Sequence, residues 1–384
     1  MKIKVIASTS KEQIITREQA LAFGGKAAGV CYMADSLETI MSEDYENTQK
    51  RINRTLNSGH HSVYDHTFFT IYLEGIPKIL AMILNNERVY TTSEKSARYT
   101  KMKTEGREQE LYEKWIEIYQ KLIQEEYPKM KAFKAGTLAK ENARYLISVF
   151  TSSTNMLYTA SLRQFNYILH MCEDYICQQE DNAFTKKVKA VLKDFVTQMS
   201  WIYVRELTIK PRTKKLALFD ETPCHNEIFE EIYAVTYEGT MAQLAQAQRH
   251  RTISYKMYVD VENKPKYYVP PIIRGTEYEA EWLKDIAELG DNFPQGRLVN
   301  IYERGNYEDF ILKCEERLCG QAQLEIMEQT YATLKTYVEH NDETYYCPFH
   351  DKLKPLLKGT RCNLPYWKCT EPCIWGKNAI NRKV

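Results

Sequence analysis

The sequence lacks any apolar run long enough for a membrane-spanning helix, and its first residues, MKIKVIASTS, lack the apolar core of a signal peptide. It also lacks an excess of charge of one sign. The 52 lysines and arginines balance 51 aspartates and glutamates to a net charge of +1, so no general field draws the chain to nucleic acid or to a membrane. These absences predict a cytoplasmic protein with no nucleic-acid and no membrane partner.

A disulfide framework is missing as well. The ten cysteines are scattered through 384 residues, and in a chain of this size we expect reduced thiols or metal ligands. The length is sufficient for two domains and a sizeable core. Hydrophobic periodicity predicts strands over 2–7, 67–73 and 232–237, and helices over 27–32, 46–58, 76–84, 105–130, 140–149, 155–171, 186–203 and 238–248.

The most distinctive stretch is 246–255, QAQRHRTISY, in which Arg249 and Arg251 flank His250 at the end of a predicted helix. Arginine carries a rigid fork of donors that fits phosphate, and cations beside a reduced flavin ring stabilise its anionic form. The triplet is therefore interpreted as an anion clamp with three adjacent donors. The alternative is a solvated basic patch.

Residues 59–75, GHHSVYDHTFFTIYLEG, gather His60, Ser62, Asp65 and His66 in front of a predicted strand. Two histidines and a carboxylate can indicate a metal site, but the spacing fits no common zinc pattern. A polar rim that holds a cofactor is the preferred interpretation.

A second polar loop, 89–100, contains the motif E-x-S-x-R-Y with Glu94, Ser96 and Arg98. A hydroxyl and an arginine this close together can grip a phosphate. Glu94 can accept a hydrogen bond from a sugar hydroxyl or a base imide. The alternative is an ordinary polar loop.

In this order and spacing, the motifs resemble those of the flavin-dependent thymidylate synthases. The family's AA-x-x-CY segment is matched by Ala27–Tyr32, its H-x-[ST]-x-x-[ED]-H motif by His60–His66, and its S-x-R-Y motif by Ser96–Tyr99. The family's A-R pair is matched by Ala143 and Arg144.

The first half departs from the family at the RHR motif, which should stand seven residues before S-x-R-Y. Arg88 holds the last position of that motif, but Asn86 and Glu87 replace the other two members. Glu87 is expected to repel the phosphates that a histidine between arginines attracts. A later family arginine is replaced by Leu169.

The second half repeats the pattern of the first, and internal duplication is the simplest account. His225 and Glu230 stand where His60 and Asp65 stood, and the helix after the next predicted strand ends in the intact RHR triplet. Further family segments are matched by Tyr267–Pro271, by Asn306 with Arg317, and by Ala322–Ile326.

The defects of the two copies are complementary. The second copy has Val259 where the serine is expected and Gly290 where the counterpart of Arg144 is expected. The first copy keeps the serine, Ser96, and the arginine, Arg144, but it lacks an intact RHR motif. Members of this family are homotetramers whose active sites take residues from more than one subunit, so the resemblance implies one complete site built from both copies.

The predicted fold class is therefore α+β: two repeats of the flavin-dependent thymidylate synthase fold, each with a mixed or antiparallel sheet and long helices, plus a cysteine-rich tail. The expected boundaries are 1–207 for the first repeat, 208–222 for a linker, 223–340 for the second repeat and 341–384 for the tail. In the tail, Cys347, Cys362, Cys369 and Cys373 are candidate ligands of zinc or of an iron–sulfur cluster, with free thiols as the alternative.

The resemblance implies methylation of dUMP to dTMP, with methylenetetrahydrofolate supplying the carbon, FAD the hydride, and NADPH the reduction of the flavin. Implied catalytic residues are Ser96, Arg144 and Arg317. Implied cofactor contacts are Arg249, His250, Arg251, His60, Ser62 and Asn306. Implied substrate contacts are Gln246, Glu94, Ser96, Arg98, Arg144 and Arg317.

Two other interpretations stay open. In a non-catalytic nucleotide- or flavin-binding homologue, the degenerate motifs would mean lost chemistry, and in a related enzyme the substrate would be a different pyrimidine nucleotide. Two copies per chain in a family of four-copy assemblies imply a homodimer that mimics a tetramer.

Overall fold

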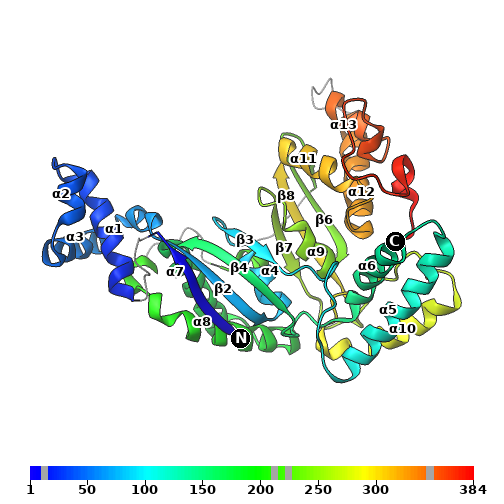
Figure 1. Ribbon diagram of the computed structural model, residues 1–384, viewed down its shortest axis with the longest axis horizontal. Helices are drawn as coiled ribbons and strands as arrows, with labels where there is room; N and C mark the ends of the chain where they lie inside the picture. Colours follow the sequence, from blue (N-terminus) through cyan, green and yellow to red (C-terminus); the bar gives the residue numbers. More distant parts are fainter. Residues whose placement is uncertain (10–15, 209–214, 221–226, 343–349) are drawn as a thin grey trace. The chain divides into compact units, whose positions relative to one another are not determined.

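The computed structural model describes residues 1–9, 16–208, 215–220, 227–342 and 350–384, which form two compact units (Figure 1). The first unit comprises Met1–Lys95 with Ser152–Asp220, and the second comprises Ser96–Thr151 with Glu221–Val384. A segment from the first half of the sequence, Ser96–Thr151, therefore folds with the second half. The units do not coincide with the sequence repeats, whose boundaries stay a prediction.

The first unit is built on a four-stranded antiparallel sheet with the order β1-β2-β4-β3. Its strands are β1 (Lys2–Ser8), β2 (Phe68–Ile76), β3 (Thr91–Glu94) and β4 (Thr154–Ser161). Its helices are α1 (Arg17–Tyr32), α2 (Leu37–Ser42), α3 (Tyr45–Ser58), α4 (Lys78–Leu84), α7 (Leu162–Gln178) and α8 (Ala183–Met199).

Local signals set the ends of α3 as the sequence predicts. The side chain of Asp44 caps the first turn by accepting a hydrogen bond from the Asn47 amide. Gly59 ends the helix with a φ of 77°, a left-handed conformation that glycine adopts without a steric penalty. The helix expected over 46–58 is therefore confirmed.

Residues 155–161, predicted as the start of a helix, form the strand β4 instead. The strand lies between β2 and β3 and buries Met156, Tyr158 and Ala160 at alternate positions, which is the periodicity of a strand. The helix α7 begins only at Leu162, where the Ser161 hydroxyl accepts from the Gln164 amide at 3.1 Å. The helix prediction over 155–161 is wrong because it overlooked this alternation.

The second unit contains another four-stranded antiparallel sheet, with the order β5-β6-β8-β7. Its strands are β5 (Ile228–Phe229), β6 (Ile232–Thr240), β7 (Ser254–Tyr258) and β8 (Leu298–Asn306). Its helices are α5 (Gly106–Glu126), α6 (Ala132–Ala143), α9 (Met241–Ala247), α10 (Glu277–Glu288), α11 (Tyr307–Arg317), α12 (Leu324–Asp342) and α13 (His350–Leu356). In both sheets the strands lie in the order first, second, fourth, third.

Two predicted helices in this unit start or end elsewhere. Strand β6 continues to Thr240, so α9 begins at Met241 rather than at residue 238. The helix expected over 140–149 is wrong, because α6 ends at Ala143 and residues 144–146 form a 3₁₀ turn. Arg144 begins that turn and is buried.

Aromatic packing holds the Ser96–Thr151 segment to the second half of the chain. The rings of Trp115 on α5 and Trp282 on α10 meet edge to face, with centroids 4.9 Å apart, and both side chains are fully buried. Trp115 Nε1 also donates to Asp285 at 2.8 Å. Buried aromatic pairs of this geometry contribute beyond their area, which explains why the segment belongs to this unit.

A buried ion pair lies between β8 and α11. Lys313 Nζ is 2.5 Å and 2.6 Å from the two carboxylate oxygens of Glu303, and both side chains are at most 1% exposed. Tyr233 and Tyr237 donate their hydroxyls to the same carboxylate at 2.7 and 2.9 Å. The charge of Glu303 is thus compensated in an interior where an unpaired charge is very costly.

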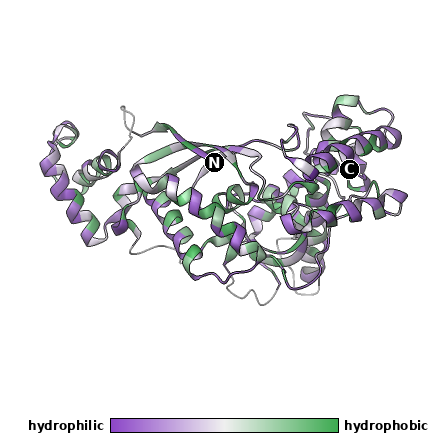
Figure 2. Cartoon of the chain, turned by 90° about the horizontal axis from the view of Figure 1, so that it is seen from below, coloured by the Kyte–Doolittle hydropathy of each residue, from purple (hydrophilic) through white to green (hydrophobic). Residues whose placement is uncertain are grey.

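The helices carry mixtures of polar and apolar residues (Figure 2). Within the described ranges, no helix is long and apolar enough to cross a membrane.

We predict that Lys313→Met destabilises the protein by about 3–5 kcal/mol in chemical denaturation, because it leaves Glu303 buried without a counter-ion. The matched control is Lys266→Met, which breaks a pair with Glu238 whose side chains are 70% and 52% exposed. The control should change the free energy of unfolding by less than about 1 kcal/mol. Equal losses in the two variants would contradict the prediction.

Candidate functional site

The RHR triplet forms a tight turn between α9 and β7. Thr240 caps the start of α9, and the helix ends at Ala247. The His250 amide donates to the Ala247 carbonyl at 2.9 Å, so the triplet follows directly from the helix end, as predicted. Arg249 and Arg251 are exposed, whereas His250 is buried.

Arg317 at the end of α11 holds His250. Its Nε donates to His250 Nε2 at 2.6 Å. Burial, with the charges of Arg317 and Lys313, lowers the pKa of His250 to about 2, so the imidazole is neutral and its proton is assigned to Nδ1. Glu316 Oε2 lies 3.6 Å from the same nitrogen, but beside a neutral ring this contact is no ion pair. The sequence pattern predicts three adjacent donors in the triplet. This prediction is wrong for His250 Nε2, which accepts a hydrogen bond from Arg317.

The positive charge of Arg317 is opposed by two arginines from separate segments. Burial lowers the pKa of Arg317, and the positive charges of Arg98 and Arg249 add to that effect. Like charges in a partly desolvated place repel unless an anion joins them. The S-x-R loop, the RHR turn and α11 thus supply the cationic surroundings that a phosphate requires.

Arg98 is fixed by contacts inside its unit. Ser96 shapes the turn that carries it, since the Thr100 amide donates to the Ser96 carbonyl at 3.0 Å and the Arg98 amide to Ser96 Oγ at 3.3 Å. Arg98 Nε pairs with Glu141 on α6, and Nη2 donates to the Gln321 carbonyl at 2.7 Å. Burial alone would lower the pKa of Arg98, but the Glu141 carboxylate outweighs burial and raises it.

Arg144 is buried with unmet hydrogen-bond donors. Arg144 is 6% exposed. Neither Nε nor Nη2 of its guanidinium has a hydrogen-bond partner in the part of the chain that the structure describes. A guanidinium stays charged in proteins, and burying its N–H groups without acceptors is costly. This cost is the clearest sign in the unit that a ligand with acceptor oxygens completes the site.

The carboxyl of Glu325 links the surroundings of Arg144 to the start of α9. It accepts from the Tyr145 hydroxyl at 2.9 Å and from the Thr240 amide and hydroxyl at 2.9 and 2.8 Å. Gln323 Nε2 donates to the Tyr145 hydroxyl at 2.7 Å. Burial raises the pKa of Glu325 to about 7, so the group is largely protonated in mildly acidic solution.

The sequence did not single out Glu141, Tyr145, Gln323 or Glu325 as site residues. The matched family segment Ala322–Ile326 contained the signal for the last two, because a glutamine and a glutamate in an otherwise apolar stretch need buried partners. For Glu141 and Tyr145 the sequence held no such signal.

The other candidate residues take up varied positions. Gln246 is half-buried, and its Oε1 has no hydrogen-bond partner among the described residues. Asn306 is exposed and caps α11 by accepting from the Asp309 amide at 2.9 Å. These placements leave Gln246 available to a ligand, whereas Asn306 already has a structural role.

Three candidates belong to the first unit: His60, Ser62 and Glu94. His60 Nδ1 shares a hydrogen bond of 2.6 Å with the Tyr32 hydroxyl, and Ser62 is exposed. Glu94 is paired with Lys78 at 2.5 Å. The remaining candidates outside the tail, from Ser96 to Arg317, belong to the second unit.

Glu87, at the middle position of the incomplete RHR motif, is an interior residue. It is 3% exposed, and its Oε1 accepts from the Ala217 amide at 2.6 Å. Burial raises the pKa of Glu87 to about 7. The expectation that Glu87 repels phosphates is therefore replaced by a structural account, in which the carboxyl anchors residues 217–219 from inside the first unit.

Of the tail ligand candidates, Cys347 lies outside the described residues, Cys369 is exposed, and Cys362 and Cys373 are half-buried. Across the described ranges, no group of three or more His, Cys, Asp or Glu side chains is placed so that it could hold a metal ion as it stands.

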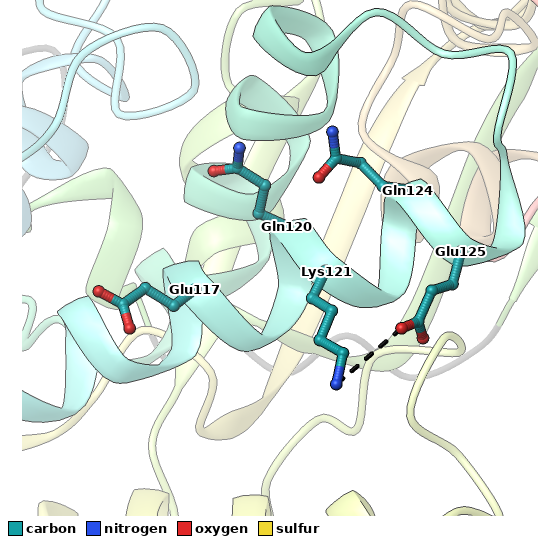
Figure 3. A pocket seen from close by; sticks show the side chains of 5 residues that line it. All are labelled: Glu117, Gln120, Lys121, Gln124 and Glu125. Carbon is teal, nitrogen blue, oxygen red and sulfur yellow. Dashed lines mark ion pairs between the residues drawn. The ribbon is translucent and has the colours of Figure 1, made fainter.

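A surface hollow on α5 is lined by Glu117, Gln120, Lys121, Gln124 and Glu125 (Figure 3). Lys121 and Glu125 form an exposed pair at 4.0 Å. None of the candidate site residues lines this hollow.

Comparison with known proteins gives a consistent result. Residues 14–196 match the model of a family described as thymidylate synthase complementing protein. A flavin-dependent thymidylate synthase from Pyrococcus furiosus is 26% identical over 156 residues, which cover 37% of this chain and 61% of that protein. One from Pseudothermotoga lettingae is 28% identical over 172 residues, which cover 42% of this chain and 76% of that protein. The match thus spans less than two thirds of the Pyrococcus protein.

Among solved structures, a UMP/dUMP methylase, PolB, from Streptomyces cacaoi with bound 5-Br dUMP is similar at 20% identity and a TM-score of 0.35, covering 54% of this chain and 92% of that chain. Thymidylate synthase X from Helicobacter pylori with FAD and dUMP is similar at 15% identity and a TM-score of 0.33, covering 55% of this chain and 98% of that chain.

We predict that His250 stays neutral, with its proton on Nδ1, between about pH 5 and pH 8. The reason is its burial beside Arg317, which opposes a second positive charge. Nitrogen chemical shifts of the ring, assigned with a His250→Gln variant, provide the measurement. A titration midpoint inside this range would contradict the assignment.

Proposed function

We propose that this relative of the flavin-dependent thymidylate synthases binds FAD and methylates dUMP to dTMP, with methylenetetrahydrofolate as the carbon donor and NADPH as the reductant of the flavin. The observation that carries the proposal is Arg144, a buried arginine with unmet donors in the same unit as the RHR turn, Arg98 and Arg317. These groups suit a ligand that combines a phosphate with a ring bearing carbonyl oxygens. A pyrimidine nucleotide is such a ligand.

The roles of the residues follow from their surroundings. Arg98 and Arg317 would hold the nucleotide phosphate, with Gln246 at its edge. Arg144 would donate to the uracil carbonyls or to the ribose, where its unmet N–H groups gain acceptors. FAD supplies the hydride when it is bound.

Arg249 and Arg251 are exposed, so their side chains are accessible to a bound flavin and would contact its phosphates and ring. The neutral His250 cannot contribute a full charge. Its role would be to fix the direction of Arg317 through the Nε–Nε2 hydrogen bond of 2.6 Å. His60 and Ser62 of the first unit remain proposed cofactor contacts. Asn306 is a less favoured cofactor contact, because its side chain already caps α11.

The site is proposed to be composite. Arg98 and Arg144 come from the first sequence copy, and the RHR turn and Arg317 from the second. Their membership of a single compact unit supports this proposal. The opposite combination would join the buried Glu87 with Val259 and Gly290 and would offer little positive charge.

We also infer an internal duplication. The two sheets share one strand order, and each second strand is followed by a short helix, α4 or α9. Two copies per chain support a homodimer that stands in for a tetramer of single-copy subunits. A monomeric mass in light scattering at micromolar concentration would contradict the dimer.

The direct test of the activity is an incubation of the purified protein with FAD, dUMP, methylenetetrahydrofolate and NADPH. We expect a yellow protein that bleaches with NADPH and forms dTMP only when all components are present. A colourless protein that takes up no FAD would favour the non-catalytic homologue. A yellow protein that bleaches but leaves dUMP unchanged would favour another pyrimidine nucleotide.

For Arg144→Met we predict opposite effects on binding and on stability. Losing two charge-assisted hydrogen bonds of ~1.5–3 kcal/mol each weakens dUMP binding by about a hundredfold or more. The free energy of unfolding of the ligand-free protein should stay equal or rise, because a buried charge with unmet donors is removed. Calorimetric titration and thermal unfolding measure the two quantities.

The matched control is Arg382→Met. Arg382 is 4% exposed, but its guanidinium donates to the carbonyls of Ala322, Ala379 and Val384. Its removal should therefore destabilise the protein. If Arg144→Met destabilised the ligand-free protein as much as Arg382→Met, Arg144 would be a structural arginine and the proposal would lose its main support.

A further inference from the structure

The loop between α11 and α12 and the tail bring cysteines together. The Arg361 amide donates to the Leu318 carbonyl at 2.8 Å. Cys319 follows Leu318 and Cys362 follows Arg361, so this backbone hydrogen bond places the two cysteines on adjacent segments of the chain. The Cys319 sulfur also accepts from the Gln321 amide at 3.4 Å, a contact that stabilises sulfur in its anionic form.

Cys373 reaches the same loop from the other side. A Cβ added to Gly320 would lie 2.7 Å from the Cys373 sulfur, so the glycine lets this sulfur approach the loop closely without displacement. The Cys319, Cys369 and Cys373 thiols lie near enough to Cys362 to oppose its ionisation. Four of the cysteines that the structure describes therefore share one small region of the second unit.

Positive groups surround this region. Arg98 and Arg382 lie close enough to Cys319 to interact with its thiolate charge. Lys134 and Arg382 lie similarly close to Cys373. Four thiolates around a divalent metal or an iron–sulfur cluster leave a net negative charge, and nearby cations compensate for it.

We propose that Cys319, Cys362, Cys369 and Cys373 form a tetrathiolate centre for a thiophilic metal, either zinc or an iron–sulfur cluster. This set replaces Cys347 of the sequence prediction with Cys319. Because the four thiols do not enclose an ion as they stand, binding must turn their side chains to a common point. Rotation between staggered rotamers provides that movement, and each thiol releases its proton when the metal binds.

The centre would hold a loop that the nucleotide site uses. The Gln321 carbonyl accepts from Arg98 Nη2, and the Gln321 side chain accepts from Lys134 Nζ at 2.9 Å. Fixing Cys319 therefore fixes the acceptor that orients Arg98. The metal would be structural, since it would act on the nucleotide site through this loop.

The test is elemental analysis of the full-length protein, purified without chelator and under exclusion of air. We expect about one zinc per chain, or about four irons with equal sulfide and a visible absorption band. Either result supports the centre and identifies the metal. A protein with neither metal, or with these cysteines in disulfides by mass spectrometry, overturns the proposal.

Cysteine variants test the ligand set. Cys319→Ser, Cys362→Ser and Cys373→Ser should each lower the bound metal at least tenfold, and so should Cys369→Ser, whose exposed position makes misfolding of the empty protein less of a concern. Cys177→Ser, an exposed cysteine of the first unit, is the matched control and should keep its metal. Loss of metal in Cys347→Ser but not in Cys319→Ser would overturn the assignment of Cys319.

Discussion

The buried carboxyl of Glu325 is the contact on which the arrangement of the second unit depends. On one side it accepts from Tyr145, the neighbour of Arg144 in the segment that comes from the first half of the sequence. On the other side it accepts from Thr240, which caps the helix that leads to the RHR turn. Because these hydrogen bonds are buried, losing either partner would leave a polar group unsatisfied. One side chain thus ties together the two halves of the proposed site.

The same unit concentrates features that cost stability. Arg144 is buried with unmet donors, and the charges of Arg98 and Arg249 each oppose that of Arg317. The compensating features lie next to them: the ion pair of Arg98 with Glu141 and the neutral state of His250. Sites that bind charged ligands are where such unfavourable arrangements are retained. By contrast, Glu303 is paired with Lys313 and accepts from the hydroxyls of Tyr233 and Tyr237, which marks this buried pair as structural.

The sequence predicted the α+β class, most of the elements and the motifs, because capping residues and periodicity are local. It placed the end of α3 at residue 58 and the RHR triplet at a helix end. It misread 155–161, where the alternation of Met156, Tyr158 and Ala160 indicated a strand, and 140–149, where a short turn buries Arg144. It could not reveal that Ser96–Thr151 packs with the second half, since that depends on contacts such as Trp115 with Trp282. The family match ends at residue 196, before the intact RHR motif, so similarity alone does not identify the partner of the S-x-R loop.

The number of tight FAD sites per chain tests the composite site most directly. A flavin dinucleotide brings a pyrophosphate and the substrate brings a phosphate, and only the combination of the S-x-R loop and Arg144 with the RHR turn and Arg317 gathers enough positive groups to bind both. Titration of the apoprotein with FAD, followed by quenching of flavin fluorescence, measures the stoichiometry. The account predicts one tight site per chain, removed by Arg249→Ala. Two tight sites per chain, or one that survives Arg249→Ala unchanged, would contradict it.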